Sequence, residues 1–324
     1  MKMLGLVTRK ASVHKLTLGL IVIISLFLVY KQYTSTPEFS KRVRKRLQHR
    51  HQYRGFSRRQ EVLDLPANPN YRIKYSLANF DNEPSVDLKR FRKVLNEDET
   101  EAYVRLVKTF QKVVTVFNLT YFIYGGSLLG SYRHHGFIPW DDDFDVIMDY
   151  RAQRQIYRVL NSVADHELDI TQMIRWKFYN RHESRNIRKY IPWRYPFIDI
   201  SFFNLSDNYI QDIDPSSRNF RFPIEIVFPL KQRPFEGLWL PTPKHSQQFL
   251  AMTYKMDVCS SPGYIHKAEL AYHDNSISHL PCDRLTDKYP FVIRRPDVVT
   301  NGDDRTEEQL TLKDKVLSTV FIQD

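Results

Sequence analysis

Apolar side chains recur at helical spacing between Asn96 and Leu119. They stand three or four residues apart, with polar residues between them, at Tyr103, Val107, Phe110, Val114 and Phe117. This spacing gathers the apolar side chains on one face of a helix and predicts that this face packs on a core. A second helix is predicted over Arg151–Asp165, where the same spacing is followed by Ile156, Val159, Leu160 and Val163.

Short runs rich in β-branched and aromatic residues predict strands. They cover Thr120–Tyr124, Phe144–Met148, Ile170–Phe178 and Pro196–Phe203. Between the first two strands, Gly125 and Gly126 lead into a segment that is compatible with a helix, Ser127–His134. The order of helices and strands predicts an α/β or α+β domain in which helices flank a mixed sheet.

An uncharged apolar run, Leu16–Tyr30, follows several basic residues near the N-terminus. Such a run is a signal peptide or a signal anchor. It is slightly shorter than a typical membrane-spanning helix, but flanking basic side chains can reach the headgroups. No small-x-small cleavage motif follows it, which favours an uncleaved anchor behind a short cytoplasmic tail, residues 1–15. We therefore expect a single-pass type II protein of the endoplasmic reticulum or Golgi membrane with a lumenal body.

Residues 31–85 are rich in Arg, Gln, Ser, Pro and Asn, which predicts a stem or linker. The folded domain is expected over residues 86–290, followed by a C-terminal extension, residues 291–324. Of the charged residues, 14 basic and 1 acidic lie in residues 1–60, against 34 basic and 36 acidic in the remainder. The net charge of +11 therefore lies outside the domain, which disfavours nucleic acid as a partner.

The chain has two cysteines, Cys259 and Cys282. In an oxidising lumen they form a disulfide or remain two separate buried thiols, and two cysteines alone do not make a structural zinc site. Asn118 and Asn204 each begin an Asn-x-Ser/Thr triplet. These triplets are candidate N-glycosylation sites and agree with a lumenal body.

The strongest chemical signal is a run of carboxylates, residues 140–145, with the sequence Trp-Asp-Asp-Asp-Phe-Asp, that opens onto an apolar strand. Because side chains alternate across a strand, Asp143 and Asp145 are expected on one face. Neighbouring carboxylates repel each other unless a cation lies between them. Mg²⁺ or Mn²⁺ binds carboxylate and phosphate oxygens together, so the spacing suits a metal-bound phosphorylated donor. An acidic surface turn is the alternative.

Upstream of these carboxylates, Gly125, Gly126 and Ser127 lead from a strand into a helix. The glycines permit close backbone approach, and the first amides of a helix can bind an anion such as phosphate. An ordinary strand-to-helix turn looks the same. Arg133, His134 and His135 lie about two turns along: Arg133 is a candidate phosphate ligand and either histidine a candidate substrate contact, the alternative for each being a surface side chain.

A third carboxylate, Asp199, lies in the predicted strand between Ile198 and Ile200. A buried charge needs a partner. A metal shared with Asp143 and Asp145 would supply one. A salt bridge to one of three basic residues is the other explanation, the candidates being Arg175, Lys177 and Arg194.

Four successive features of the chain resemble the LicD family, which includes bacterial phosphocholine transferases, fukutin and fukutin-related protein. They are the glycine pair, the helix, the segment Gly-Phe-Ile-Pro-Trp-Asp-Asp-Asp-Phe-Asp at residues 136–145, and the later Phe-Ile-Asp-Ile strand. The likeness is dense from Tyr124 to Asp145, recurs at Asp199 and extends from about Leu88 to Tyr289. No cysteine cluster like the zinc-binding loop of fukutin-related protein is present, so zinc is not implied.

The resemblance implies a nucleotidyltransferase-like fold, in which a Gly-Ser turn holds phosphates and three strand carboxylates hold two metals. Gly126 and Ser127 would then contact the donor phosphate, and Asp143, Asp145 and Asp199 would be the catalytic metal ligands. Asp141 is a further candidate ligand. The implied reaction moves a phospho-alcohol, such as ribitol phosphate or phosphocholine, from a CDP-linked donor to a hydroxyl of a glycan or glycoprotein.

Two other functions are compatible with the chain. A Golgi glycosyltransferase with an Asp-x-Asp motif would share the anchor and stem, although the upstream glycines and Asp199 argue against it. A catalytically inactive lumenal binding protein with the same fold is the second alternative, and the intact carboxylates argue against degeneration without excluding it.

Overall fold

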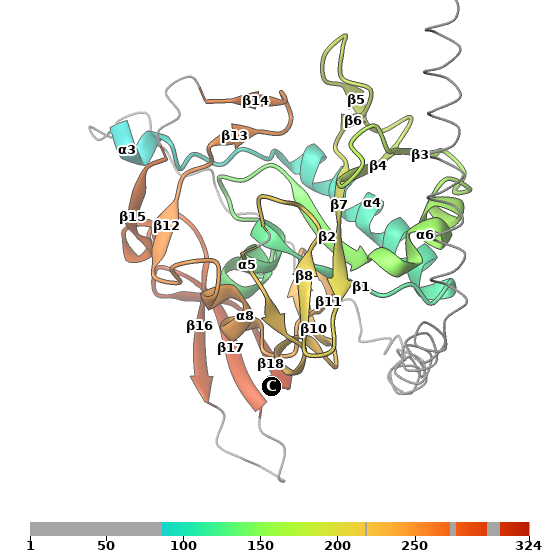
Figure 1. The fold of residues 1–324 in the computed structure, drawn as a ribbon. Coiled ribbons are helices and arrows are strands. Elements are labelled where there is room, and N and C mark those ends of the chain that lie inside the picture. Colours follow the sequence, from blue (N-terminus) through green and yellow to red (C-terminus); the bar gives the residue numbers. More distant parts are fainter. Residues whose placement is uncertain (1–85, 218, 273–276, 297–304, 324) are drawn as a thin grey trace, which may run out of the picture. The chain divides into compact units, whose positions relative to one another are not determined.

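The computed structural model describes residues 86–217, 219–272, 277–296 and 305–323 (Figure 1). The expected tail, anchor and stem, residues 1–85, lie outside the described residues. Within the described part of the chain, no helix has both the length and the apolar character needed to cross a membrane.

A seven-stranded mixed sheet forms the centre of the domain, with the strand order β1-β2-β7-β4-β3. β2 and β7 are parallel and the other pairs in this order are antiparallel. β8 pairs with the end of β7, and β9 pairs with β8. The bounds are β1 Tyr121–Ile123, β2 Phe144–Asp149, β3 His166–Asp169, β4 Trp176–Asn180, β7 Ile198–Leu205, β8 Tyr209–Asp212 and β9 Phe222–Pro223. The predicted mixed sheet in an α/β domain is confirmed.

Helices pack on both faces of this sheet. On one face, Phe110 of α4 contacts Tyr121 and Phe178. On the other face, Phe249 of α8 contacts Phe122. The helices and helical turns are α3 Val86–Lys89, α4 Glu97–Val116, α5 Gly125–His134, η2 Tyr150–Ala152, α6 Gln153–Leu160, α7 Ile224–Val227, α8 Ser246–Ala251 and η3 Cys282–Leu285.

The first predicted helix is present as α4. Asn96 is its N-cap and accepts a hydrogen bond from the Glu99 amide, while the Glu99 side chain accepts from the Asn96 amide. This reciprocal capping satisfies two amides that a helix start otherwise leaves unpaired. Of the predicted apolar face, Tyr103, Val107, Phe110 and Val114 are buried, whereas Phe117, at the C-cap of the helix, is exposed.

The predicted strand Ile170–Phe178 is wrong in its first part. β3 ends at Asp169, and β4 does not begin until Trp176. The Asp169 side chain accepts hydrogen bonds from both the amide and the hydroxyl of Thr171. An aspartate that bonds two residues ahead favours a turn over continued strand pairing. The second predicted helix is also shorter than expected, since α6 ends at Leu160.

Smaller sheets surround the central one. Four are two-stranded: β5 Arg185–Asn186 with β6 Arg194–Tyr195, β10 Lys231–Phe235 with β11 Leu238–Thr242, β12 Val258–Ser260 with β15 His279–Pro281, and β13 Tyr264–Ile265 with β14 Leu270–Ala271. The fifth is three-stranded, from β16 Phe291–Pro296, β17 Arg305–Leu312 and β18 Lys315–Gln323. Its Glu308, Leu310 and Ile322 are buried, and β16 contacts α5.

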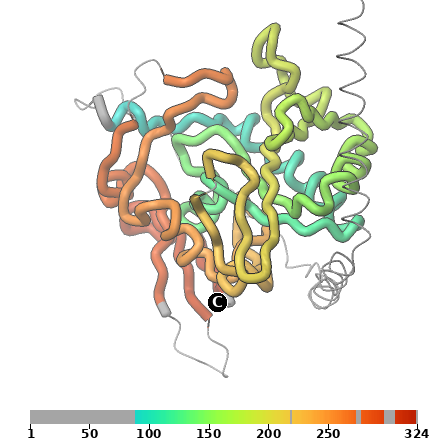
Figure 2. The backbone as a smooth tube through the Cα atoms, in the orientation of Figure 1, coloured from blue at the N-terminus to red at the C-terminus, as the bar shows by residue number. Residues whose placement is uncertain are grey.

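The backbone path brings the chemically important segments together. Figure 2 shows the green chain that contains β2 beside the yellow chain that contains β7. These strands are about fifty residues apart in sequence, yet Phe144 to Asp149 pair in register with Ile198 to Phe203. The carboxylates of both segments are therefore carried by adjacent strands.

Candidate functional site

Three carboxylates meet at the paired strands β2 and β7. Asp145 in β2 pairs directly with Asp199 in β7, and because the strands are parallel both side chains project from the same face. Asp143 immediately precedes β2 and is 9% exposed, and Asp199 is 3% exposed. The sequence-predicted set of three catalytic carboxylates is therefore gathered in one place.

These carboxylates disfavour each other's ionisation. Burial, followed by the charges of neighbouring carboxylates, raises the pKa of Asp143 and of Asp145 well above the usual range. Burial and the charges of Asp142 and Asp145 also raise the pKa of Asp141, to about 6, although His266 opposes the shift. A divalent cation would remove this repulsion, because it favours the ionised form of every carboxylate around it.

Lys177 supplies part of the compensation. It lies opposite Asp199 in the antiparallel pair of β4 and β7, and its Nζ forms an ion pair with Asp199 Oδ2. Of the other two candidate partners, Arg175 pairs with Asp214 at 3.0 Å and Arg194 donates to the Arg181 carbonyl at 2.6 Å. The salt bridge that was the alternative explanation for Asp199 is therefore present, and Lys177 makes it.

One oxygen of Asp199 remains available. Asp199 Oδ1 is buried and has no hydrogen-bond partner among the described residues. A buried acceptor without a partner is costly, so such an atom indicates a ligand or a cation. Together with the raised pKa values of Asp143 and Asp145, this unpartnered oxygen shows that the donor set suits a hard divalent cation.

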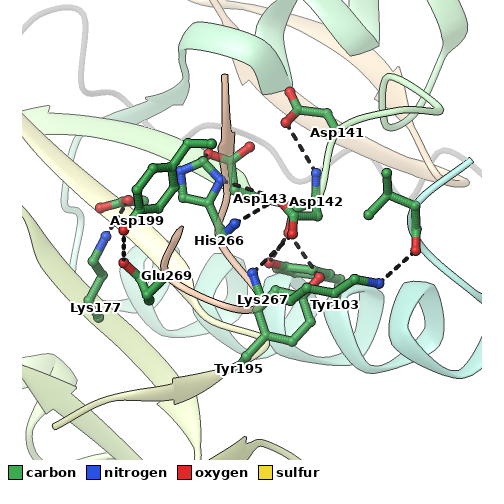
Figure 3. A network of polar contacts seen from close by, with 12 residues as sticks. Tyr103, Asp141, Asp142, Asp143, Lys177, Tyr195, Asp199, His266, Lys267 and Glu269 are labelled. Atoms are coloured by element: carbon green, nitrogen blue, oxygen red, sulfur yellow. Dashed lines mark hydrogen bonds and ion pairs between the residues drawn. The ribbon is translucent and has the colours of Figure 1, made fainter. Parts of the chain in front are cut away.

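His266 is a site residue that sequence analysis missed. Its Nδ1 lies 3.2 Å from Asp142 Oδ1, and its Nε2 lies 3.3 Å from Asp143 Oδ2 (Figure 3). The backbone amides of His266 and Lys267 also donate to the two Asp142 oxygens, at 3.1 and 2.9 Å. His266 lies in the turn after β13, far from the carboxylates in sequence, and no motif around it indicates this contact.

The ring of His266 faces carboxylates on both sides. Burial alone would lower its pKa, but the Asp143 charge and the hydrogen bond with Asp142 raise the pKa of His266 to about 10. The side chains of Asp141, Asp142 and His266 lie close enough together to hold a metal. A protonated ring has no lone pair for a metal, however. In the metal-free protein His266 is therefore placed as a counter-ion of Asp142 and Asp143, and Asp143, Asp145 and Asp199 remain the predicted metal ligands.

The glycine pair lies directly against the carboxylates. A Cβ on Gly125 would lie 2.9 Å from Asp145 Oδ2, and one on Gly126 would lie 2.7 Å from Asp141 Oδ2. Gly125 also has a positive φ of 54°, which other residues adopt at a cost. Ser127 is buried, and its hydroxyl oxygen accepts from the Asp145 amide at 2.8 Å. This bond attaches the first turn of α5 to β2 and leaves the hydroxyl hydrogen available for donation.

A pocket of about 320 Å³ opens in front of the glycine pair. Its polar wall contains Gly125, Gly126, Asp145 and Arg175, and its apolar wall includes Phe220, Phe249 and Tyr254. The first amides of α5 begin at this wall, where a helix favours an anion. The pocket therefore combines a phosphate-sized polar cradle with aromatic surfaces on which a planar base can stack.

Arg133 and His135 do not line this pocket. Arg133 is 8% exposed, and its Nη1 lies 3.2 Å from Cys282 Sγ. Burial lowers the pKa of Arg133 to about 10. His135 Nε2 lies 2.8 Å from Glu308 Oε2 in a separate buried cluster. The neighbouring His134 bonds the Pro290 carbonyl at 2.7 Å.

The remaining predicted residues do not line the pocket either. Asn118 and Asn204 are both exposed. Cys259 and Cys282 are joined by a disulfide.

Known proteins are similar in sequence to this part of the chain. Residues 118–245 match the family model described as LicD/FKTN/FKRP, nucleotidyltransferase domain. Over 168 residues, which are 49% of this chain and 32% of the relative, the sequence is 26% identical to ribitol 5-phosphate transferase FKRP of Mus musculus. Over 57 residues, which are 18% of this chain and 22% of the relative, it is 35% identical to lipopolysaccharide cholinephosphotransferase LicD of Haemophilus influenzae. The chain thus spans about a fifth to a third of the length of these relatives.

A solved structure of the lincosamide antibiotic adenylyltransferase LnuA with lincomycin bound is also similar. It is 15% identical, with a TM-score of 0.31, over 45% of this chain and 83% of that chain.

The glycine turn and the three carboxylates all lie within residues 118–245, which match the model described as a nucleotidyltransferase domain. Residues 118–245 are thus similar to the LicD family. The resemblance seen in the sequence is confirmed, and the family includes transferases of phospho-alcohols.

Proposed function

We propose that this chain transfers a phospho-alcohol from a CDP-linked donor to a hydroxyl of a glycan or glycoprotein, with Mg²⁺ or Mn²⁺ at Asp143, Asp145 and Asp199. The observation that carries the proposal is the placement of these carboxylates beside the Gly125 cradle and its pocket. The relatives named for transfer of phosphocholine and ribitol 5-phosphate support this class of reaction.

The donor would enter the pocket with its phosphates against the glycine pair. The absence of side chains at Gly125 and Gly126 lets the carboxylates of Asp145 and Asp141 lie close against the backbone of this turn, since a Cβ at either position would meet a carboxylate oxygen. Arg175, about one-third exposed, lines the same pocket and offers a guanidinium to phosphate oxygens. The aromatic side chains Phe220, Phe249 and Tyr254 would hold the cytosine.

The reaction proposed is an in-line displacement at phosphorus. The oxygen of the acceptor hydroxyl forms the new bond to the phosphorus that bears the alcohol, the bond from that phosphorus to the bridging oxygen breaks, and CMP leaves. In this proposal the carboxylate of Asp199 also accepts the proton of the acceptor hydroxyl. A divalent cation bound by the carboxylates would offset negative charge on the phosphate oxygens.

We place the reaction in the secretory pathway, in a single-pass type II protein of the endoplasmic reticulum or Golgi with a lumenal domain. The apolar run at residues 16–30 supports an anchor. The disulfide between Cys259 and Cys282 supports an oxidising compartment. The exposure of Asn118 and Asn204 is compatible with their glycosylation.

The test is release of CMP by the full-length chain with Mg²⁺ or Mn²⁺ from CDP-ribitol, CDP-choline or CDP-glycerol, with UDP-sugars measured in parallel. We expect turnover of a CDP-alcohol and its loss in Asp143→Ala. Asp149→Asn, at the far end of the same strand, is the matched control and should keep activity. Turnover of UDP-sugars alone would replace the proposal with a glycosyltransferase. No turnover of any donor would favour a binding protein.

A further inference from the structure

A second pocket, of about 370 Å³, opens at the other end of α5. Its walls include Tyr132, Lys231, Arg233, Lys244, Arg294 and Glu308. Among the described residues, it shares no lining residue with the pocket in front of Gly125 and Gly126, the glycine pocket. Tyr132 follows Gly125 by seven helical positions, which corresponds to about 10 Å along the axis. The two pockets are therefore separate sites.

Positive charge dominates this second pocket. Its lining has the cations of Lys231, Arg233, Lys244 and Arg294 and one carboxylate, Glu308. Arg233 Nη2 donates to both Glu308 oxygens at 2.7 Å, and Arg294 Nε lies 2.8 Å from Glu308 Oε1. Glu308 is thus already shared between two guanidinium groups. Lys231 and Lys244 are partly exposed and have no carboxylate partner within the part of the chain that the structure describes.

The guanidinium groups are held in fixed positions. The Arg294 guanidinium carbon lies 3.4 Å from the centre of the Tyr132 ring, and that of Arg233 lies 4.9 Å from it. Arg294 also donates to the Tyr132 carbonyl. Fixed donors bind an anion with little loss of conformational freedom, which distinguishes a built site from a scatter of surface lysines.

One N–H donor in the wall of this pocket has no partner among the described residues. The Arg233 side chain is 5% exposed, and its Nε has no hydrogen-bond partner among the described residues. Buried N–H groups in native proteins are normally satisfied. A donor of this kind in the wall of a cationic pocket indicates an acceptor that is supplied by a ligand.

We propose that this pocket binds a phosphate or sulfate group, either as the free ion or as an ester on a sugar. Arginine presents paired N–H donors that match tetrahedral oxyanions, and the lysines add charge at the pocket mouth. The volume suits a small molecule. The proposal does not depend on the transferase reaction, because it concerns residues that do not contact the glycine pocket.

Calorimetric titration of the full-length chain, without divalent metal, tests the proposal. The probes are inorganic phosphate, inorganic sulfate, glucose 6-phosphate and uncharged glucose. We expect saturable binding of at least one anion, weakened by added sodium chloride, and none of glucose. Tighter binding of glucose 6-phosphate than of phosphate would identify an ester as the ligand. Equal binding would identify the oxyanion alone.

Paired variants show where the anion binds. Lys231→Gln with Lys244→Gln should weaken binding tenfold or more. Lys108→Gln with Lys112→Gln changes two exposed lysines of α4 and removes the same charge, so it should leave binding within twofold. Thermal melts of both double variants check that each is folded. Absence of saturable anion binding, equal binding of glucose, or equal losses in the two double variants would overturn the proposal.

Discussion

Asp145 and Asp199 face each other across the parallel strands β2 and β7 as a directly registered pair. Lys177 compensates the charge of Asp199. Among the described residues no basic side chain forms an ion pair with Asp145, and its pKa is raised by burial and by Asp143. Without bound metal, the protein therefore contains one carboxylate whose charge a lysine compensates beside one whose charge is not compensated. This asymmetry makes the two residues respond differently to substitution.

Asp145→Asn should leave the melting temperature of the metal-free protein unchanged or raise it, because the variant removes a charge that its surroundings disfavour. The stabilisation by Mg²⁺ or Mn²⁺ should disappear. For the native chain, that stabilisation is expected to be about 2.7 kcal/mol when the metal is present at about 100 times its dissociation constant. Thermal melts with and without metal measure both effects. An undiminished metal shift in the variant would exclude Asp145 as a ligand.

Lys177→Met should destabilise the metal-free protein by about 3–5 kcal/mol, the usual cost of removing one member of a buried ion pair. The cause is the uncompensated Asp199 carboxylate. Urea unfolding gives the free-energy difference. The double variant Lys177→Met with Asp199→Asn should recover much of the loss, because no buried charge remains. A single variant as stable as the native chain would contradict this role of the pair.

Gly125→Ala should lower the free energy of unfolding by about 1 kcal/mol or more, because an alanine at this position must adopt a left-handed backbone conformation. It should also reduce metal binding, since its Cβ would lie 2.9 Å from Asp145 Oδ2. Gly263→Ala is the control: its Cβ would meet only the end of Ile277, at 3.4 Å. Unfolding and metal titrations of both variants compare the positions. Equal behaviour of the two would refute the close approach at Gly125.

His266→Gln should destabilise the metal-free protein, because it removes the cation between Asp142 and Asp143. The shift in melting temperature on adding Mg²⁺ should become larger, since metal then supplies the missing positive charge. His279→Gln is the matched control, because His279 is exposed and contacts Ser260. A smaller metal shift in His266→Gln would instead identify His266 as a metal ligand.

Glu308 should make the fold sensitive to acid. Burial would raise its pKa, but the hydrogen bond with His135 and the charges of Arg233 and Arg294 lower it, from 4.5 to about 2. A carboxylate whose pKa is lowered by folding stabilises the folded state at pH values above its unfolded-state pKa. This stabilisation, on the order of 3 kcal/mol, is lost as the pH falls from about 4.5 to about 2.

Melts of the native chain and Glu308→Gln between pH 7 and pH 2 test this contribution. The variant should be less stable at neutral pH, because Arg233 and Arg294 lose their shared partner. Its deficit should shrink through the acid range as Glu308 of the native chain becomes protonated. A deficit that stays constant down to pH 2 would show that the ionisation of Glu308 contributes little to stability.

The sequence was sufficient to predict that Asp145 and Asp199 lie on strands. Strand alternation placed the side chain of Asp199 opposite those of Ile198 and Ile200, and this local rule needs no knowledge of the tertiary fold. The choice among three basic partners for Asp199 could not be made, because it depends on the register between β4 and β7. That register places Lys177 directly opposite Asp199.

Contacts made by turns and by the C-terminal strands were beyond prediction. His266 reaches Asp142 from the turn after β13, over a separation of 124 residues, and loop positions have no periodicity that reveals their neighbours. Likewise, the buried partner of His135 is Glu308, in the segment expected to be an extension. His135 was predicted to contact substrate because it stands near the motif in sequence, whereas its side chain belongs to the second pocket's charge cluster.

The disulfide between Cys259 and Cys282 closes a covalent ring that contains His266 and Lys267. The paired strands β12 and β15 hold the two ends of this ring together. A segment tied at both ends has fewer conformations to lose when it settles against Asp142. The counter-ion His266 thus lies in a loop that the disulfide cross-links. Reduction of the disulfide, at a distance from the carboxylates, is therefore expected to weaken the contact that balances their charge.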